Sequence, residues 1–247
     1  MHSTILRVEN LTIGYGNRTL VRDISFELTR GECVLLAGPN GSGKTTLLKA
    51  LAEGSRPSQK QMADQVGHDG GHRHSRLDRE SPRAILIPTN IPQVKGFTVE
   101  AFIQTGCYAE SDWRGRISAD AAGRMEKALE LLGIKHLKER DIATLSDGEF
   151  QKTCLAVGLT RKAEVLLLDE PTAFLDVENR IGVLQALRDI ARKTGTAVLF
   201  SSHDIHDAVQ VADRIFALTH DGRFIASTQE NRPAVLRETF PTLAETI

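Results

Sequence analysis

The sequence predicts an α/β fold built on a mostly parallel sheet. Short apolar runs recur along the chain, helical patterns lie between them, and a glycine-rich turn joins the first run to a helix. The apolar runs are residues 33–37, 84–87, 165–168, 197–200 and 215–218. Runs that are apolar at every position are typical of strands buried on both faces of a parallel sheet. Their alternation with helices is the pattern of an α/β protein.

Three stretches between these runs have the periodicity of helices. The first covers residues 44–53 and is followed by Gly54, where a left-handed residue that ends a helix is expected. The other two each carry an apolar stripe along one helix face. The stripes are Met125, Ala128, Leu129 and Leu132, before Gly133, and Ile181, Leu184, Leu187 and Ala191, before Gly195.

Two regions interrupt the alternation. Residues 55–82 are polar and without apolar period, so we expect a long exposed loop there. This loop holds His68, His72 and His74, but no cysteine or carboxylate cluster at a recognised metal spacing accompanies them. A solvated loop is therefore favoured over a metal sensor. Residues 97–159 are mostly helical and lie between core strands, which predicts an inserted helical subdomain.

The predicted organisation is a single domain over the whole chain. Its segments are a core at about 1–88 and 160–220, the helical subdomain at about 97–159, the exposed loop at 55–82 and a C-terminal tail at 221–247.

Charge and cysteines narrow the class of partner. The chain has 31 Lys plus Arg against 32 Asp plus Glu, a formal net charge of -1, so no broad basic field collects nucleic acid or anionic lipid. The three cysteines, Cys33, Cys107 and Cys154, have no paired metal spacing. This pattern favours a protein of the reducing cytosol. No secretory signal is recognisable, and no stretch approaches the roughly 20 apolar residues that cross a bilayer. We expect a chain that does not itself span a membrane.

A phosphate-binding loop follows the first apolar run. The pattern G-x-x-x-x-G-K-[ST] is matched between a strand and a helix by Gly38, Pro39, Asn40, Gly41, Ser42, Gly43, Lys44 and Thr45, with Thr46 next in the helix. Glycines let backbone N–H groups surround phosphates, and the helix N-terminus adds its positive end. Lys44 is suited to the β and γ phosphates of ATP, and the Thr45 hydroxyl to Mg²⁺. The alternative, a glycine-rich turn with a chance lysine, does not account for the flanking strand and helix.

An acidic pair ends the apolar run 165–168. Asp169 is placed to bind Mg²⁺, and Glu170 to act as general base on the attacking water. Many strands end in an acidic turn, so the pair alone is a weak signal. After a phosphate-binding loop it predicts nucleotide hydrolysis.

The segment Leu145-Ser-Asp-Gly-Glu149 resembles the LSGGQ signature of ABC (ATP-binding cassette) ATPases, about twenty residues before Asp169. Ser146 can also be an ordinary cap of the helix that begins near Glu149. The resemblance implies that Ser146, Gly148 and Glu149 face the γ-phosphate of ATP held by a second copy, in a head-to-tail homodimer. The fold it implies is the P-loop ATPase fold with an inserted helical subdomain.

Further matches to the family cover most of the chain. Tyr15 is placed like the aromatic residue that stacks on adenine, with a core tyrosine as the alternative. Asp176 resembles the aspartate of the D-loop, which reaches across the dimer. His203 resembles the switch histidine at the γ-phosphate, although a lone histidine after a strand is more often structural.

Two segments depart from the family pattern. The glutamine expected after Ile87-Pro88 is replaced by Thr89 and Asn90. Thr89 fits the spacing, and we assign it to the metal site, whereas Gln93 keeps the chemistry, so the role stays open among the three residues.

In the signature, Asp147 and Glu149 stand where the family has glycine and glutamine. Two carboxylates near a triphosphate are unfavourable unless they turn away, satisfied by backbone N–H groups or Lys152.

A signature of this type, together with LLLDEPTAFLD, is similar to ATPases of bacterial importers for iron chelates, haem or cobalamin. That resemblance implies a homodimer on the cytoplasmic face of the inner membrane, bound to integral membrane permease subunits and, through them, to a substrate-binding protein. The groove that receives the permease is expected near Thr89 to Phe102.

Two alternatives are a cytosolic ABC ATPase that remodels macromolecules and a nucleotide-binding module without turnover. The remodelling enzymes need coiled-coil arms or two phosphate loops, and this chain has one such loop and no long heptad stretch. The intact set of Lys44, Asp169, Glu170 and His203 argues against a module without turnover.

Overall fold

The computed structural model describes residues 3–15, 18–54, 83–228 and 230–240. The predicted exposed loop and its three histidines lie outside the described residues, as does the side chain of Tyr15. Among the described residues, no helix has both the length and the apolar character needed to cross a membrane.

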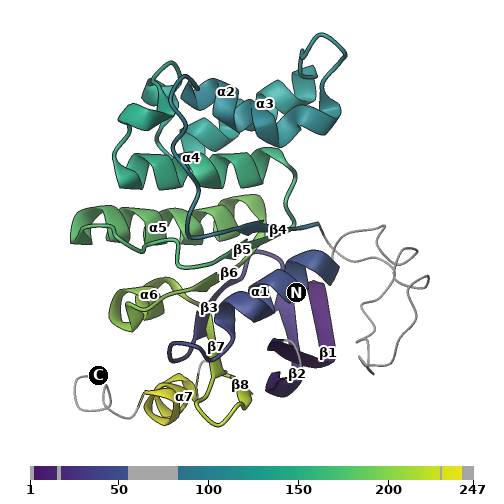
Figure 1. The fold of residues 1–247 in the computed structure, drawn as a ribbon, viewed down its shortest axis with the longest axis vertical. Helices are drawn as coiled ribbons and strands as arrows, with labels where there is room; N and C mark the ends of the chain where they lie inside the picture. Colours follow the sequence, from purple (N-terminus) through teal and green to yellow (C-terminus); the bar gives the residue numbers. More distant parts are fainter. Residues whose placement is uncertain (1–2, 16–17, 55–82, 229, 241–247) are drawn as a thin grey trace.

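The core is a six-stranded sheet with strand order β4-β5-β6-β3-β7-β8 (Figure 1). The first five strands in that order pair in parallel, and β8 is antiparallel to β7. The strands are β3 (Cys33–Ala37), β4 (Ala84–Ile87), β5 (Val165–Leu168), β6 (Ala197–Ser201), β7 (Arg214–Leu218) and β8 (Phe224–Ala226). The mostly parallel sheet confirms the predicted fold class.

Alternate side chains of the sheet belong to two hydrophobic clusters, one on each face. Leu35 and Phe200 pack with α5 (Val177–Thr194), α6 (Ile205–Val211) and the helical subdomain. Leu36 and Leu199 pack on the opposite face, against α1 (Lys44–Gly54) and the N-terminal hairpin. Both faces of the sheet are therefore covered, which explains why its strands are apolar at every position.

The helical subdomain lies between β4 and β5 in the sequence. It consists of α2 (Val99–Gln104), η2 (Thr105–Glu110), α3 (Ala119–Leu131), η3 (Lys135–Leu137), η4 (Ile142–Thr144) and α4 (Asp147–Thr160). Figure 1 shows α2, α3 and α4 gathered at one end of the molecule, with α5 between them and the sheet. The apolar stripe of α3, from Met125 to Leu132, is buried as predicted.

Helix α5 departs from its predicted stripe at its first turns. Leu184, Leu187 and Ala191 are buried, but Ile181 of the same stripe is 41% exposed. Val177, one turn earlier, is also exposed. The beginning of α5 extends past the elements that cover the rest of the helix, and periodicity alone does not show where that cover ends.

The N-terminal hairpin was missed by the sequence analysis. Strands β1 (Thr4–Tyr15) and β2 (Arg18–Thr29) form a separate antiparallel sheet. Their pairing shifts register at several points, one of them between Val8 and Leu11, where Asn10 has a φ of 51°. Such irregularities break the period of two by which a strand is recognised.

The segment predicted as a tail contains regular structure. Besides β8 it forms α7 (Arg232–Thr239), in which Val235 and Leu236 are buried. Leu236 joins the cluster on the α5 face of the sheet.

Candidate nucleotide site

A pocket of about 390 Å³ lies at the carboxyl ends of β3, β4, β5 and β6. The loops that follow the strands of a parallel sheet meet at this edge, where ligands of α/β proteins bind. The pocket is lined by Leu20, Asn40, Gly41, Gly43, Lys44, Thr45, Thr46, Thr89, Asp169, Glu170 and His203. All but Leu20 are residues that the sequence analysis proposed.

The loop from Gly38 to Gly43 presents its backbone to the pocket. Gly43 has a φ of 106°, and a Cβ atom there would lie 3.2 Å from Ile13 Cδ1 of the hairpin. The backbone conformation thus favours glycine, and the space beside it is tight. Among the described residues, the N–H groups of residues 43–46 have no hydrogen-bond partner. Together with the N-terminus of α1 they form a ready site for the oxygens of a phosphate.

Lys44 is folded back over the loop that precedes it. Its Nζ donates hydrogen bonds to the carbonyl oxygens of Gly38 at 2.8 Å and Pro39 at 3.3 Å. The residue is only 7% exposed, and this burial lowers the pKa of its ammonium group, against the opposing effect of the nearby Glu170 and Asp169 carboxylates. A buried ammonium group is stabilised by an anionic partner. A phosphate in the pocket would be such a partner for Lys44.

Asp169 is the centre of a set of hydroxyl groups. Thr45 Oγ1 donates to Asp169 Oδ2 at 2.8 Å, and Ser201 Oγ donates to Asp169 Oδ1 at 3.0 Å. Thr89 Oγ1 donates to the main-chain oxygen of Asp169 at 2.8 Å. Thr45 of α1 and Ser201 of β6 thereby hold the two oxygens of the carboxylate, and Thr89, which follows β4, holds the main chain of the same residue.

Glu170 is held in a strained conformation with its carboxylate buried. Its φ is 50°, which is uncommon outside glycine. Oε2 accepts a hydrogen bond from the main-chain N–H of His203 at 3.0 Å, and His203 Nε2 lies 3.2 Å from Oε1. That second contact lacks hydrogen-bond geometry, so Oε1 is buried without a hydrogen-bond partner. Ser201 Oγ accepts from the Glu170 N–H at 2.9 Å.

Burial raises the pKa of the Glu170 carboxyl above its ordinary value, although His203 and Lys44 oppose the shift. A carboxylate with a raised pKa is a stronger base than an exposed one, and its unsatisfied Oε1 can accept a hydrogen bond from a water molecule. Both properties suit a general base.

The residues around Asp169 fit a magnesium ion. Mg²⁺ prefers oxygen ligands and is commonly bound by one or two carboxylates together with substrate phosphates and water. Thr45 Oγ1 and the Asp169 carboxylate supply such oxygens beside the phosphate loop. No group of three or more His, Cys, Asp or Glu side chains able to hold a metal occurs within the described ranges. The Thr45 hydroxyl and the Asp169 carboxylate fit a magnesium ion that takes its other ligands from a nucleotide and water.

The three candidates for the expected glutamine lie differently. Thr89 lines the pocket, whereas Asn90 and Gln93 do not. The Thr89 hydroxyl hydrogen is used on Asp169, so its oxygen is free only as an acceptor or ligand.

The signature segment does not line the pocket. Ser146 is the N-cap of α4, and its Oγ accepts from the Glu149 N–H at 3.3 Å. In return Glu149 Oε2 accepts from the Ser146 N–H at 2.9 Å, and this backbone hydrogen bond lowers the pKa of Glu149. Arg140 lies 3.9 Å from the other carboxylate oxygen. The carboxylate that departs from the family pattern is thus turned onto its own helix.

Asp176 also lies outside the pocket and caps α5. Its Oδ1 and Oδ2 accept from the main-chain and side-chain nitrogens of Asn179, each at 2.8 Å, and these bonds lower the pKa of Asp176. Asn179 in turn packs against Gly148, where a Cβ atom would come within 2.4 Å of Asn179 Oδ1. The signature and the first turn of α5 are therefore in direct contact.

Three residues extend the site beyond the sequence analysis. Ser201 connects Asp169 and Glu170, and Leu20 of β2 lines the pocket. Arg180 of α5 forms ion pairs with Asp204 and Asp207, next to His203. Ser201 directly precedes Ser202 and His203, so the histidine motif could have identified it. Leu20 reaches the pocket through the hairpin, which the sequence did not predict.

A glycine loop with free N–H groups, a buried lysine and an aspartate–glutamate pair define a P-loop nucleotide hydrolase. The sequence model of the ABC transporter family matches residues 21–173. The chain is 32% identical over 222 residues to the ferric enterobactin transport ATP-binding protein FepC of Escherichia coli, covering 90% of this chain and 80% of that protein. It is 33% identical over 252 residues to the hemin import ATP-binding protein HmuV of Bradyrhizobium diazoefficiens, covering 98% and 89%.

The fold agrees with solved ATP-binding cassettes. The ADP conformation of MJ1267, an ATP-binding cassette of an ABC transporter, superposes with a TM-score of 0.74 at 20% identity and covers 98% of each chain. The chain belongs to the ABC transporter family. It is an ATP-binding and ATP-hydrolysing subunit, as the signature predicted, and the transport subunits among its relatives favour transport over macromolecular remodelling.

Proposed function

We propose that the chain is the Mg²⁺-dependent ATPase of an importer for a metal chelate of the iron-chelate, haem or cobalamin class. The observation that carries hydrolysis is the buried Glu170 carboxylate, whose Oε1 has no hydrogen-bond partner and lies beside His203. Relatives named for ferric enterobactin transport and hemin import support the class of cargo.

The residues of this chain divide the chemistry among them. The N–H groups of residues 43–46 bind phosphate oxygens, and Lys44 exchanges its loop carbonyls for the β and γ phosphates. Thr45 and Asp169 hold Mg²⁺, which neutralises phosphate charge when bound. Glu170 accepts the proton of the attacking water, and the His203 N–H keeps its carboxylate in place.

The active unit is a head-to-tail homodimer. The α4 end with Ser146, Gly148 and Glu149 does not line the pocket described above. Phe174, in the turn beside Asp176, is 88% exposed, and Val177 and Ile181 continue this apolar surface along α5. An apolar surface next to an incomplete site is what a second copy would cover.

The dimer binds integral membrane permease subunits from the cytoplasmic side, and a substrate-binding protein acts through them. The segment before α2 supports this docking, because Val94 and Phe97 are exposed apolar side chains close in sequence to Thr89 of the pocket. A helix of the permease laid on this segment would sense the nucleotide through Thr89 and its bond to Asp169.

The test is reconstitution with the integral membrane proteins that co-purify with the chain. ATPase activity should rise in their presence, and a radiolabelled ferric siderophore, haem or cobalamin should accumulate in the vesicles only with ATP. Export, or co-purification with nucleic acid instead of a membrane protein, would contradict the proposal.

A further inference from the structure

Two of the three most exposed aromatic side chains of the described chain belong to the helical subdomain. Trp113 is 86% exposed and is the single tryptophan of the sequence, and Tyr108 is 82% exposed. Trp113 lies in a small hairpin between η2 and α3, closed by an antiparallel bridge between Ser111 and Ile117. Neither aromatic residue lines the nucleotide pocket.

The hairpin is held in shape by its own hydrogen bonds. Asp112 Oδ1 accepts from the N–H groups of Arg114 at 2.8 Å and Arg116 at 2.9 Å. The Asp112 N–H donates to the Arg116 carbonyl, and the Gly115 N–H to the Asp112 carbonyl, both at 2.9 Å. Gly115 has a φ of 75°, as a tight turn requires. Trp113 is therefore presented on an ordered backbone, which lowers the entropic cost of using it as a contact.

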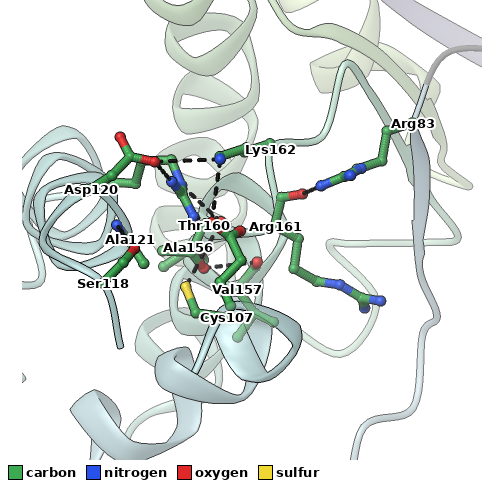
Figure 2. A network of polar contacts seen from close by, with 12 residues as sticks. Arg83, Cys107, Ser118, Asp120, Ala121, Ala156, Val157, Thr160, Arg161 and Lys162 are labelled. Atoms are coloured by element: carbon green, nitrogen blue, oxygen red, sulfur yellow. Dashed lines mark hydrogen bonds and ion pairs between the residues drawn. The ribbon is translucent and has the colours of Figure 1, made fainter. Parts of the chain in front are cut away.

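The base of the hairpin is tied to two helices. Glu110 forms ion pairs with Arg124 of α3 at 2.8 Å and with Lys162, after α4, at 3.2 Å. Arg124 also donates to the Thr160 carbonyl at 3.1 Å. Figure 2 shows Asp120, Thr160 and Lys162 meeting at this end of α4. The base of the hairpin is thus attached to α3 and to the end of α4.

These bonds leave the hairpin with unpaired positive charge. The carboxylates of Glu110 and Asp112 are engaged inside the structure, whereas the side chains of Arg114 and Arg116 form no ion pair with any described residue. The Arg114 guanidinium lies 4.4 Å from the centre of the Trp113 ring. Tryptophan, tyrosine and arginine together are the residues that dominate the energy of protein interfaces.

A protein partner fits this surface better than a lipid surface. Binding to anionic membranes takes clusters of about four to eight basic residues, and the hairpin offers two. Acidic and basic residues are equal in number between residues 97 and 162, so the surrounding subdomain adds no broad basic field that would attract such a membrane. A narrow, ordered projection with a tryptophan near its tip is shaped for a recess in another protein.

We propose that the hairpin 111–117 is a docking element that inserts Trp113 into an acidic recess of the membrane-embedded partner subunit. Carboxylates of that subunit pair with Arg114 and Arg116. The site lies beyond the segment before α2 and adds a second point of attachment at the far edge of the helical subdomain. The proposal rests on the proposed function, because that function supplies the partner.

The single tryptophan makes the test specific. The full chain is labelled with 5-fluorotryptophan, which gives one ¹⁹F resonance, from position 113. It is mixed with nanodiscs that hold the unlabelled, co-purifying membrane protein and, separately, with empty nanodiscs of the same phosphatidylcholine and phosphatidylglycerol. The resonance should shift and lose its solvent-isotope effect with the loaded discs and stay unchanged with the empty ones.

Variants measure the contribution of the hairpin. Trp113→Ala should weaken the complex about 30-fold. The double reversal Arg114→Glu with Arg116→Glu should weaken it further in low salt, and basal ATPase activity of the free chain should be unchanged in both. Lys127→Glu, on the exposed side of α3, is the control for added negative charge and should leave binding intact.

Three outcomes would overturn the proposal. A shift with empty nanodiscs would assign the hairpin to lipid. A complex that forms without any shift at position 113 would remove the hairpin from docking while leaving the proposed function standing. If no membrane protein binds the wild-type chain, the proposed function is refuted. The docking of the hairpin on a membrane-embedded subunit is then refuted as well.

Discussion

The N-termini of α1 and α4 both carry the positive partial charge of a helix end and N–H groups that lack a partner within the helix, but their side chains differ. The N-terminus of α1 opens into the pocket, has no acidic residue in its first turn and carries Lys44. The N-terminus of α4 carries Asp147 and Glu149 in its first turn and is closed by the capping box of Ser146 and Glu149. Both ends have the positive partial charge of a helix dipole, but the N–H groups of residues 43–46 are without a partner among the described residues at the α1 end, whereas the cap occupies the Glu149 N–H at the α4 end.

The difference indicates a division of labour. In the proposed dimer, the α1 end binds phosphate within its own chain, whereas the α4 end meets only a nucleotide that is bound by the second copy. The capping box stabilises the beginning of α4 without a ligand, because Ser146 satisfies the Glu149 N–H and Glu149 satisfies the Ser146 N–H.

The largest expected effect concerns Glu170. Glu170→Gln removes the base but keeps the size of the side chain, so turnover should fall about 10³-fold while ATP still binds. Because both helix ends can then engage without hydrolysis, a nucleotide-bound dimer should accumulate. Single-turnover hydrolysis and light scattering measure the two effects. An unchanged rate would take the base role from Glu170.

Lys44 tests the α1 end alone. Lys44→Ala removes the buried ammonium group and should weaken ATP affinity about 100-fold, in the monomer as well as in the dimer. Calorimetry at concentrations below dimerisation measures this. Ser146→Ala is the matched control at the other helix end and should leave monomer affinity unchanged. Equal losses of monomer ATP affinity in Lys44→Ala and Ser146→Ala would show that the α1 and α4 ends do not differ in this way.

The pH dependence of hydrolysis follows from the raised pKa of Glu170. The base must be ionised, and a raised pKa keeps it protonated to higher pH, so activity is lost as pH falls through that value. Below it, kcat/KM should decrease about tenfold for each pH unit. If activity is lost on the acid side at a pH no higher than the pKa of an ordinary exposed glutamate, burial does not raise the pKa of Glu170.

The smallest effects belong to the α4 end. Ser146→Ala should destabilise the chain by about 1 kcal/mol through loss of the cap, as chemical denaturation would show. Glu149→Gln keeps the capping box but removes a charge, so ATP-driven dimerisation should tighten, on the order of threefold. Asp147→Asn removes a charge that takes no part in the box and serves as control. Weaker dimerisation in Glu149→Gln would mean that the carboxylate itself contacts the partner copy.

The sequence by itself determined the sheet and the phosphate-binding side of the site. Apolar runs such as residues 165–168 can only be buried on both faces, and the spacing of Gly43 and Lys44 is tied to local backbone geometry. The chemistry of Asp169 and Glu170 follows from their place at a strand end. These features depend on neighbours in the sequence, so local pattern was sufficient to find them.

Only the tertiary structure decided what depends on distant segments. The bulged hairpin that brings Leu20 to the pocket, the exposure of Ile181 and the self-capping of Glu149 were not readable from periodicity. The contact of Gly148 with Asn179 joins segments about thirty residues apart. Burial and charge are settled by whichever surfaces meet in space, and a one-dimensional pattern does not specify which surfaces those are.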